Sequence, residues 1–446
     1  MTVPQKTPTM PSAFRGIDIP SDDVLTSCMH CGLCLPTCPT YTLTWRERSS
    51  PRGRIRLIKA VAEGELEISK NFVEEMNFCL DCQACETACP AGVKYGSLVE
   101  AARAQIFAQK HESFLSRLVK NVFMGWFFAA RGRFHFMARF LRIYQRSGLQ
   151  WILDKSRLLR LVSPKLANLQ GLTPAVSSQF SSQMLKAVMP AYGPAKRRVG
   201  FLTGCIMDVA YAQVNIDTVE LLREHGCDVV IPTGTLCCGS LHAHNGDMGR
   251  AREFARNVID AFSASDLETI VMNSAGCGAF MKEYGHLFHD DRELSEAAAA
   301  ISAKTKDLTE FLVAVGFKGS REFRQETPTA FRGKRITYHD ACHLVHTQKV
   351  MSQPRALIAS IPGLDVAELP ESTWCCGSAG IYNIVRYDDS MKLLDRKVEK
   401  IRSVRPDIVV TGNPGCMVQI THGLGKSGLS IELMHTATFL RKACEA

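Results

Sequence analysis

Two cysteine-rich segments of this chain share one spacing: three cysteines separated by two residues each, then a fourth after three more residues, followed by proline. The first segment contains Cys28, Cys31, Cys34, Cys38 and Pro39, and the second contains Cys79, Cys82, Cys85, Cys89 and Pro90. This spacing is typical of chains that wrap [4Fe–4S] clusters, where the fourth cysteine of each run ligates the cluster of the other run. We therefore predict two clusters with exchanged ligands, one held by Cys28, Cys31, Cys34 and Cys89, the other by Cys79, Cys82, Cys85 and Cys38.

Structural zinc is the alternative interpretation of such cysteines. A zinc site, however, is usually built from two Cys-x-x-Cys pairs. It does not require a triplet of cysteines with a proline-flanked fourth, and still less two copies of that arrangement. The spacing therefore favours iron–sulfur clusters. A zinc or interaction module without redox activity would be excluded by about eight irons per chain with little zinc.

The length and the N-terminal sequence bound the class of protein. A chain of 446 residues predicts roughly two to four domains. The first thirty residues lack the basic start and apolar stretch of a secretory signal, and no apolar run is long enough to span a bilayer. We therefore expect a cytoplasmic protein, with peripheral attachment to the inner face of the cytoplasmic membrane as an open alternative. In a reducing compartment, the eighteen cysteines are better explained as metal ligands than as disulfides.

Residues 1–105 are expected to form a ferredoxin-type domain that is mostly α-helical. Between the cysteine segments, Pro51 begins a predicted helix with one apolar face. That face is predicted to consist of Ile55, Leu57, Ile58 and Val61. Arg52 and Arg54 on the same helix are interpreted as surface or ion-paired residues. The alternative is that they stabilise a reduced, more negative cluster.

Residues 106–195 contain no cysteine and carry the excess of positive charge. Thirteen Lys and Arg residues stand between Arg103 and Lys165 against two acidic residues, whereas the rest of the chain holds 40 basic and 42 acidic residues. Aromatic and apolar residues recur among these charges, so we predict a basic helical connector. It is interpreted as a cover for the cluster domain or a docking segment for a partner, with contact to an anionic membrane as the alternative. No nucleic-acid-binding motif accompanies the charge, and no nucleic acid is expected as a partner.

Residues 196–446 contain an internal repeat, predicted as two domains over 196–330 and 331–446. In each copy a cysteine follows an apolar strand, a Cys-Cys-Gly (CCG) sequence comes next, and a further cysteine ends the pattern. These cysteines are Cys205, Cys237, Cys238 and Cys277 in the first copy, and Cys342, Cys375, Cys376 and Cys416 in the second. Matching order and spacing indicate a duplicated domain, and alternating strand and helix patterns predict mainly parallel sheets. The predicted fold class is therefore α+β multidomain: an α-helical ferredoxin-type domain, a basic helical linker and duplicated α/β CCG domains.

The paired cysteines of the repeats are candidates for a second redox or metal site. Adjacent thiolates can bind different irons of an opened cluster, so a redox or metal role is favoured over simple burial, and an additional iron–sulfur centre in the repeats is an open prediction. His339, His343 and His346 surround Cys342 and are interpreted as ligands or proton donors, or else as ordinary capping and surface residues. Two cysteines lie outside the pattern and are expected to be free thiols, Cys227 and Cys444.

Several longer segments are distinctive: CMHCGLCLPTCPTY, PRGRIRLIKAV, CLDCQACETACPAGVKYG, SAGCGAFMKEYG and CCGSAGIYN. Through them the chain resembles the iron–sulfur subunit of bacterial glycolate oxidase (glycolate dehydrogenase) over nearly its whole length. The resemblance implies an oxidoreductase subunit that acts in a complex. It implies that FAD-containing partner subunits oxidise glycolate to glyoxylate. This chain would then relay their electrons through two [4Fe–4S] clusters towards a quinone or a similar acceptor.

Related families share the two-part plan and supply the alternatives. One is the iron–sulfur subunit of an anaerobic glycerol-3-phosphate or lactate dehydrogenase. Another is a thiol/disulfide reductase similar to heterodisulfide reductase, with the CCG repeats as its active site. In this wider group the repeats commonly end in Cys-x-x-Cys, but here Ser274 and Asn413 stand where the earlier cysteine is expected. A four-ligand site in each repeat, or none, is therefore expected in place of a five-cysteine site.

Overall fold

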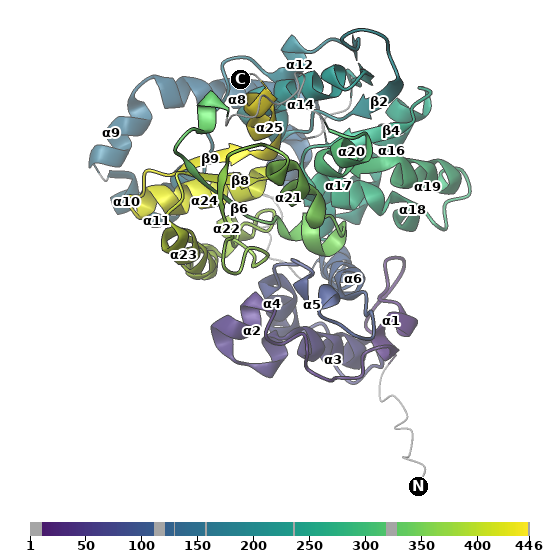
Figure 1. Ribbon diagram of the computed structural model, residues 1–446. Helices are drawn as coiled ribbons and strands as arrows, with labels where there is room; N and C mark the ends of the chain where they lie inside the picture. Colours follow the sequence, from purple (N-terminus) through teal and green to yellow (C-terminus); the bar gives the residue numbers. More distant parts are fainter. Residues whose placement is uncertain are drawn as a thin grey trace. The chain divides into compact units, whose positions relative to one another are not determined.

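The computed structural model describes residues 11–110, 121–128, 130–156, 158–234, 237–317 and 328–444. The chain forms two compact units. The first contains residues Met1–Asn121 and Leu241–Ala251, and the second contains Val122–Ser240 and Arg252–Ala446. Short helices make up the first unit and two sheets with covering helices make up the second (Figure 1). The α+β multidomain prediction is therefore confirmed.

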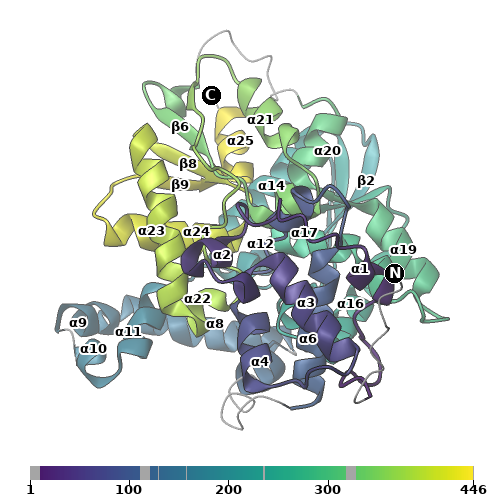
Figure 2. The ribbon, with the colours of Figure 1, turned by 90° about the horizontal axis from the view of Figure 1, so that it is seen from below.

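Short helices joined by cysteine-bearing loops build the first unit. The helices are α1 (Asp22–Thr26), α2 (Pro39–Thr44), α3 (Pro51–Ala62), α4 (Lys70–Phe78), α5 (Ala84–Thr87) and α6 (Tyr95–Ala108), with a 3₁₀ turn at Glu47–Ser49. Helices α3, α4 and α6 lie side by side (Figure 2) and bury Ile58, Val61 and Leu98 among them. No strand occurs among the described residues of this unit, so the mostly helical prediction is confirmed.

The start of α3 explains the sequence Ser-Pro-Arg-Gly. Ser50 precedes the helix and its Oγ accepts a hydrogen bond from the backbone N–H of Gly53 at 3.0 Å, while Pro51 occupies the first turn. A Cβ atom on Gly53 would lie 1.9 Å from the carbonyl oxygen of Glu47. Glycine is therefore required for α3 to pack against the preceding turn, which brings the two cysteine segments close together.

Two parallel sheets organise the second unit. The first sheet contains β1 (Val188–Met189), β2 (Arg197–Phe201), β3 (Cys227–Val230), β4 (Thr269–Met272) and β5 (Thr305–Asp307), in the order β1-β3-β2-β4-β5. The second contains β6 (Arg335–Tyr338), β7 (Asp365–Ala367), β8 (Ile408–Thr411) and β9 (Glu432–His435), in the order β7-β6-β8-β9. Strands β2 to β5 and β6 to β9 thus follow one topology, which confirms the duplicated α/β fold. Only β1, contributed by the linker, pairs antiparallel among the described strands.

Helices cover both sheets and form most of the linker. The linker contains α8 (Arg131–Arg146), α9 (Leu149–Ser156), α10 (Leu158–Val162), α11 (Pro164–Gly171) and α12 (Ser181–Met184), after a π-helical turn at Asn121–Phe127. The first repeat contains α13 (Ile206–Ala210), α14 (Ala212–Glu224), α15 (Ser240–His244), α16 (Met248–Ser263), α17 (Ala275–Lys282), α18 (Tyr284–Leu287), α19 (Ser295–Lys304) and α20 (Leu308–Ala314). The second contains a 3₁₀ turn at Thr329–Phe331, a π-helical turn at His343–Thr347, α21 (Ser352–Ala359), α22 (Tyr382–Val385), α23 (Tyr387–Val404), α24 (Pro414–Lys426) and α25 (Thr436–Cys444).

The two repeats share one hydrophobic core. Val199 and Phe201 of the first repeat belong to the same buried cluster as Ile336, Val410 and Phe439 of the second. Helix α14 packs against α25, and α23 and α24 lie beside each other next to the second sheet (Figures 1 and 2). The repeats are therefore halves of one folded body. None of the described helices combines the length and apolar character needed to cross a bilayer.

Candidate metal centres

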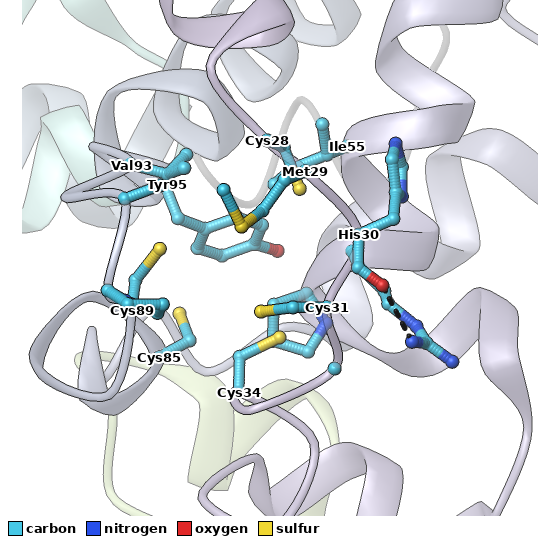
Figure 3. A pocket seen from close by; sticks show the side chains of 15 residues that line it. Cys28, Met29, His30, Cys31, Cys34, Ile55, Cys85, Cys89, Val93 and Tyr95 are labelled. Carbon is cyan, nitrogen blue, oxygen red and sulfur yellow. Dashed lines mark hydrogen bonds between the residues drawn. The ribbon is translucent and has the colours of Figure 1, made fainter.

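The eight cysteines of the two N-terminal segments line two cavities in the first unit. One cavity is bordered by the thiols of Cys28, Cys31, Cys34 and Cys89, together with Cys85, apolar side chains and Arg52. Figure 3 shows Cys31, Cys34 and Cys89 with their sulfur atoms directed towards the middle of this cavity. The other cavity is bordered by Cys38, Cys79, Cys82 and Cys85. The structure therefore groups the fourth cysteine of each run with the triplet of the other run.

The two cavities are neighbours. Pro51, Cys85 and Tyr95 line both of them. Each cavity offers at least four thiols in an otherwise largely apolar wall, and four thiolates are the donor set that a [4Fe–4S] cluster requires. The residues present thus fit two such clusters.

The two cysteine loops share the same local backbone conformation. His30 and Gly32 in the first loop, and Asp81 and Gln83 in the second, all have φ between 53° and 87°, in the left-handed region. These residues stand two and four positions after the first cysteine of each loop. Because non-glycine residues rarely adopt this conformation, its recurrence at three of them indicates that the loop shape is imposed by the site. The N–H of Asp81 points at the Cys79 sulfur at 3.3 Å.

The two cavities differ in exposure and in polar contacts. Of the four thiols assigned to the first cavity, Cys31 is exposed and the others are half-buried, whereas all four assigned to the second are buried. In the second cavity the Tyr95 hydroxyl donates to the Cys79 sulfur at 3.4 Å, and Thr40 Oγ1 contacts the Cys38 sulfur at 3.3 Å. Hydrogen bonds to ligating sulfurs stabilise negative charge on them. These contacts would help to stabilise a reduced cluster in the second cavity.

Arg52 and Arg54, which the sequence analysis treated alike, have different environments. Arg52 pairs with Glu47 at 2.6 Å and donates to the carbonyl oxygen of His30. Arg54 is completely buried and lines the second cavity. Its guanidinium donates to Thr40 Oγ1 at 3.0 Å and to the Glu75 carbonyl at 2.9 Å. Both interpretations therefore apply to both residues: each arginine is ion-paired, Arg54 with Glu75 at 3.9 Å, and each lines one of the thiol cavities.

A buried group of charged side chains contacts the second cysteine loop on the side of α6 and residue His244. Arg103 donates to the carbonyl oxygens of Met76 and Cys79. His244 lies 3.2 Å from Asp81 and 2.8 Å from Glu100. Burial alone lowers the pKa of His244, but the hydrogen bonds to the two carboxylates outweigh this and raise it to about 10. This group could not be predicted from the sequence, because His244 is far from the second cysteine loop along the chain.

The cysteines of each repeat lie at the carboxyl ends of three adjacent strands. Cys205 follows β2, the Cys237–Cys238 pair comes after β3, and Cys277 lies in the first turn of α17 after β4. In the second repeat, Cys342, the Cys375–Cys376 pair and Cys416 follow β6, β7 and β8. Parallel strands place their carboxyl ends at one edge of the sheet. The topology therefore brings each set of four thiols together.

The thiols contact one another in the same order in both repeats. Cys205 contacts Cys237 and Cys238 contacts Cys277 across the first repeat. In the second repeat Cys342 contacts Cys375, and Cys376 contacts Cys416. The two sets nevertheless differ electrostatically. Contacts with Cys375, Cys416 and His339 lower the pKa of the Cys376 thiol, whereas contacts with Cys237 and Cys277, together with burial, raise that of Cys238.

The glycine of each CCG sequence is required by the backbone. Gly239 has a φ of 93° and Gly377 a φ of 90°, values that residues with a Cβ rarely adopt. A Cβ on Gly377 would also lie 2.7 Å from the carbonyl oxygen of Ser390. This turn places two successive thiols at the carboxyl ends of the strands.

The histidines near Cys342 have different surroundings and do not form one group. His339 is buried and lies against Cys376 and Cys416. His346 approaches the carbonyl oxygen of Thr373 at 3.4 Å, which is a structural contact. Neither of the two cysteines outside the pattern, Cys227 and Cys444, forms a disulfide among the described residues, and both are buried in the hydrophobic core.

The residues that replace the expected earlier cysteines stand at helix starts. Ser274 precedes α17 and Asn413 precedes α24. Asn413 Oδ1 accepts a hydrogen bond from the N–H of Gly276 at 3.3 Å, and its Nδ2 lies 3.6 Å from the Cys416 sulfur. Asn413 thus joins the two repeats, and each repeat keeps four cysteines of the repeated pattern.

Helix α8 of the linker covers the first set of repeat cysteines. Phe134 and Ala138 of α8 share a buried cluster with Cys205 and Cys237. His135 fastens the helix by a 2.8 Å contact with Asp208, which lies three residues after Cys205. The linker is therefore part of the second unit and encloses its first thiol site.

Comparisons with known proteins match each of these regions. Residues 24–93 match a 4Fe-4S dicluster domain, residues 115–173 match the linker region of the glycolate oxidase iron–sulfur subunit, and residues 199–282 and 336–421 match a cysteine-rich domain. A probable glycolate oxidase iron–sulfur subunit of Bacillus subtilis is 40% identical over 94% of each chain. The glycolate oxidase iron–sulfur subunit of Escherichia coli is 31% identical over 90% of each. Lactate utilization protein A of Geobacillus thermodenitrificans is 33% identical over 54% of this chain and 98% of its own.

The dicluster match and the two thiol-lined cavities together assign iron–sulfur clusters to this chain. The cysteine-rich matches coincide with the two sheets and confirm the duplication.

Proposed function

This chain belongs to the family of glycolate oxidase iron–sulfur subunits, and from that premise we propose that it relays electrons within a complex that oxidises a 2-hydroxy acid, glycolate first among them. The observation that carries the proposal is the pair of adjacent four-thiol cavities. Clusters bound there would supply one-electron transfer. As a member of a family of subunits, the chain acts with other subunits, and we propose that an FAD-containing partner carries out the chemistry on the substrate.

The proposed ligands follow the grouping of the thiols in the two cavities. One cluster is assigned to Cys28, Cys31, Cys34 and Cys89, and the other to Cys38, Cys79, Cys82 and Cys85. The partly exposed first set suits exchange with a partner, because electron transfer between proteins requires close approach. In the second set, Arg54 and the Tyr95 hydroxyl favour added negative charge.

The linker supports a membrane-facing role for the second unit. The outer face of α8 exposes Phe136, Phe140 and Ile143, each about two-thirds accessible and spaced at one helical face, with Arg139 between them. Large apolar side chains flanked by arginines suit the boundary between anionic headgroups and acyl chains. We therefore propose that this face attaches the complex peripherally to an anionic membrane, where a quinone or similar acceptor would be available.

The opposite face of the same helix supports a link between attachment and electron delivery. Phe134 and Ala138 on that face contact the site of Cys205 and Cys237. A thiol site of the first repeat is thus separated from the proposed membrane face by the thickness of one helix. This arrangement favours a place for the repeats between the clusters and the acceptor.

The test of the electron-relay proposal compares the full chain alone with the same chain in complex with its flavoprotein partner, under anaerobic conditions. Glycolate should bleach the visible cluster absorption in the complex and leave the isolated chain unchanged. Robust glycolate oxidation by the isolated chain would refute the division of labour. Lactate or glycerol 3-phosphate in place of glycolate tests the related dehydrogenases.

The second candidate function makes the repeats a thiol/disulfide reductase. The observation that favours it is the unbroken contact of four thiols in each repeat. The Cys376→Ser variant separates the two functions. If electron flow from glycolate to the acceptor is unchanged in this variant, the second repeat does not lie on the electron-transfer path.

A further inference from the structure

The second repeat contains a tight group of three donor atoms. The sulfurs of Cys376 and Cys416 and a ring nitrogen of His339 all lie within 4.8 Å of one another. The three residues are 1–2% exposed. They come from the carboxyl ends of β7, β8 and β6, three adjacent strands, and the N–H of His339 is held by the carbonyl oxygen of Val410 at 2.9 Å. The backbone thus fixes all three donors.

The His339 ring has the Cys376 thiol as a hydrogen-bonding partner. Neither of its ring nitrogens bonds to an oxygen or nitrogen atom among the described residues, although the ring is almost fully buried. Burying an imidazole without an oxygen or nitrogen partner is unfavourable. Its polar neighbours are the Cys376 and Cys416 thiols. A cation bound between the three groups would satisfy the ring nitrogen.

Separations of at most 4.8 Å are closer to those of donors on one metal ion than to those of thiolates around a cluster. Donors of one tetrahedral zinc ion, bound at 2.0–2.3 Å, lie roughly 3.5–3.8 Å apart. In a [4Fe–4S] cluster each thiolate binds a different iron, so the sulfurs stand farther apart. Among the described residues, neither the two N-terminal cavities nor the first repeat gathers three such donors within 4.8 Å. The second repeat is distinct in this respect.

The first repeat differs by one residue at the corresponding place. Leu202 stands three positions before Cys205, as His339 stands three positions before Cys342. Leu202 is buried and offers no donor. The two repeats therefore share a thiol arrangement but only the second adds an imidazole.

A buried cation completes the charge balance in the second repeat. Lys397 is fully buried, donates to the carbonyl oxygens of Glu371 and Ser372, and interacts electrostatically with Cys376 and Cys416. A divalent ion with three thiolates carries one net negative charge. The Lys397 ammonium offsets that charge in an interior where an uncompensated one would be costly.

We infer that the second repeat binds a single thiophilic divalent cation, Zn²⁺, through His339, Cys376 and Cys416, and that the half-buried Cys342, which is close enough to Cys416 to interact with it electrostatically, moves in as the fourth ligand. Zinc prefers this mixture of imidazole and thiolate donors in tetrahedral geometry. The inference does not depend on glycolate or on the flavoprotein partner. It assigns the two repeats different contents, with the ion confined to the second.

The experiment measures zinc and iron in the full chain purified anaerobically, and in the His339→Leu variant, which copies Leu202 of the first repeat. The native chain should contain one zinc ion in addition to its cluster iron. His339→Leu should lower zinc at least fivefold and leave cluster iron unchanged, which shows that the first unit is intact. His343→Ala is the matched control, because His343 neighbours Cys342 without joining the donor group, and it should retain zinc.

A second measurement keeps the inference testable if His339→Leu folds poorly. Zinc K-edge absorption of the native chain should show one nitrogen and three sulfur donors. Protein produced with Co²⁺ should show thiolate-to-cobalt charge-transfer bands that His343→Ala preserves. Absence of stoichiometric zinc from the native chain, retention of zinc in His339→Leu, or extra iron lost with Cys376→Ser would each overturn the inference. None of these results bears on glycolate-dependent reduction of the N-terminal clusters, so the two proposals fail separately.

Discussion

Replacing Tyr95 by Phe should lower the reduction potential of one cluster and leave the other unchanged. The Tyr95 hydroxyl donates to the Cys79 sulfur at 3.4 Å, and its ring is buried in the wall shared by both cavities. Phenylalanine keeps the ring and removes only the donor. Since that hydrogen bond is stronger when the sulfur carries more negative charge, its loss destabilises the reduced state more than the oxidised state.

The size of the shift follows from the energy of one hydrogen bond. A hydrogen bond to a charged group contributes about 1.5–3 kcal/mol. Because the sulfur is negative in both oxidation states, we expect roughly one-third of that, about 0.5–1 kcal/mol, to distinguish them. At 59 mV and 1.4 kcal/mol per tenfold change for one electron, the potential should fall by about 20–45 mV.

An EPR-monitored redox titration of the full chain measures both potentials. The control is Tyr41→Phe, because Tyr41 lies on α2 and its ring contacts Trp45. Equal shifts at both clusters, or a rise in potential, would contradict the assignment of Cys79 to a single cavity and the role of the hydroxyl.

Three further predictions concern stability and binding. Gly377→Ala should destabilise the chain by about 1–3 kcal/mol, measured by denaturant unfolding, because alanine rarely adopts a φ of 90°. The pKa of His244, raised to about 10 in the folded state, lies above its unfolded value near 6.5. His244 should therefore stabilise the fold fully below pH 6.5, and this contribution should disappear as pH rises towards 10; His244→Gln should flatten that part of the stability profile. Phe136→Ser with Phe140→Ser should weaken sedimentation with anionic vesicles at least about tenfold, since burying each ring contributes about 1.5–3 kcal/mol.

Each of these predictions has its own check. Gly316→Ala provides a comparison for Gly377, because a Cβ at this positive-φ glycine meets no atom within 4 Å. An unchanged pH profile in His244→Gln would show that the buried ion pairs do not form. Equal binding of the double Phe variant to anionic and neutral vesicles, at the native level, would favour a protein partner for α8.

The cysteine grouping and the helical start of α3 could be predicted because they depend on local sequence. Three thiols within seven residues must face one centre, and Pro51 after Ser50 starts a helix wherever the chain runs. The paired repeats were recognisable because the nearly equal spacing of Cys237 and Cys375 from the preceding cysteines, 32 and 33 positions, reflects equal topology. These features need no knowledge of distant contacts.

The remaining features depend on long-range packing. Arg54 has the local sequence of a surface residue, and only the convergence of α3 with Thr40 and Glu75 buries it. His339 differs from His343 and His346 only through the positions of β7 and β8, which bring Cys376 and Cys416 to it. The left-handed conformation of Gln83 has no signal in its residue type.

The first unit is discontinuous along the chain, and this has a consequence for its biosynthesis. Residues 241–251 complete it: His244 closes the ionic group behind the second cysteine loop, and Gly246 approaches the backbone of Arg103 too closely for any side chain. A ribosome must therefore synthesise more than half of the protein before the N-terminal body can close. Iron and sulfide delivered earlier would meet an incompletely folded first unit. A fragment ending near residue 110 would lack residues 241–251 in the same way.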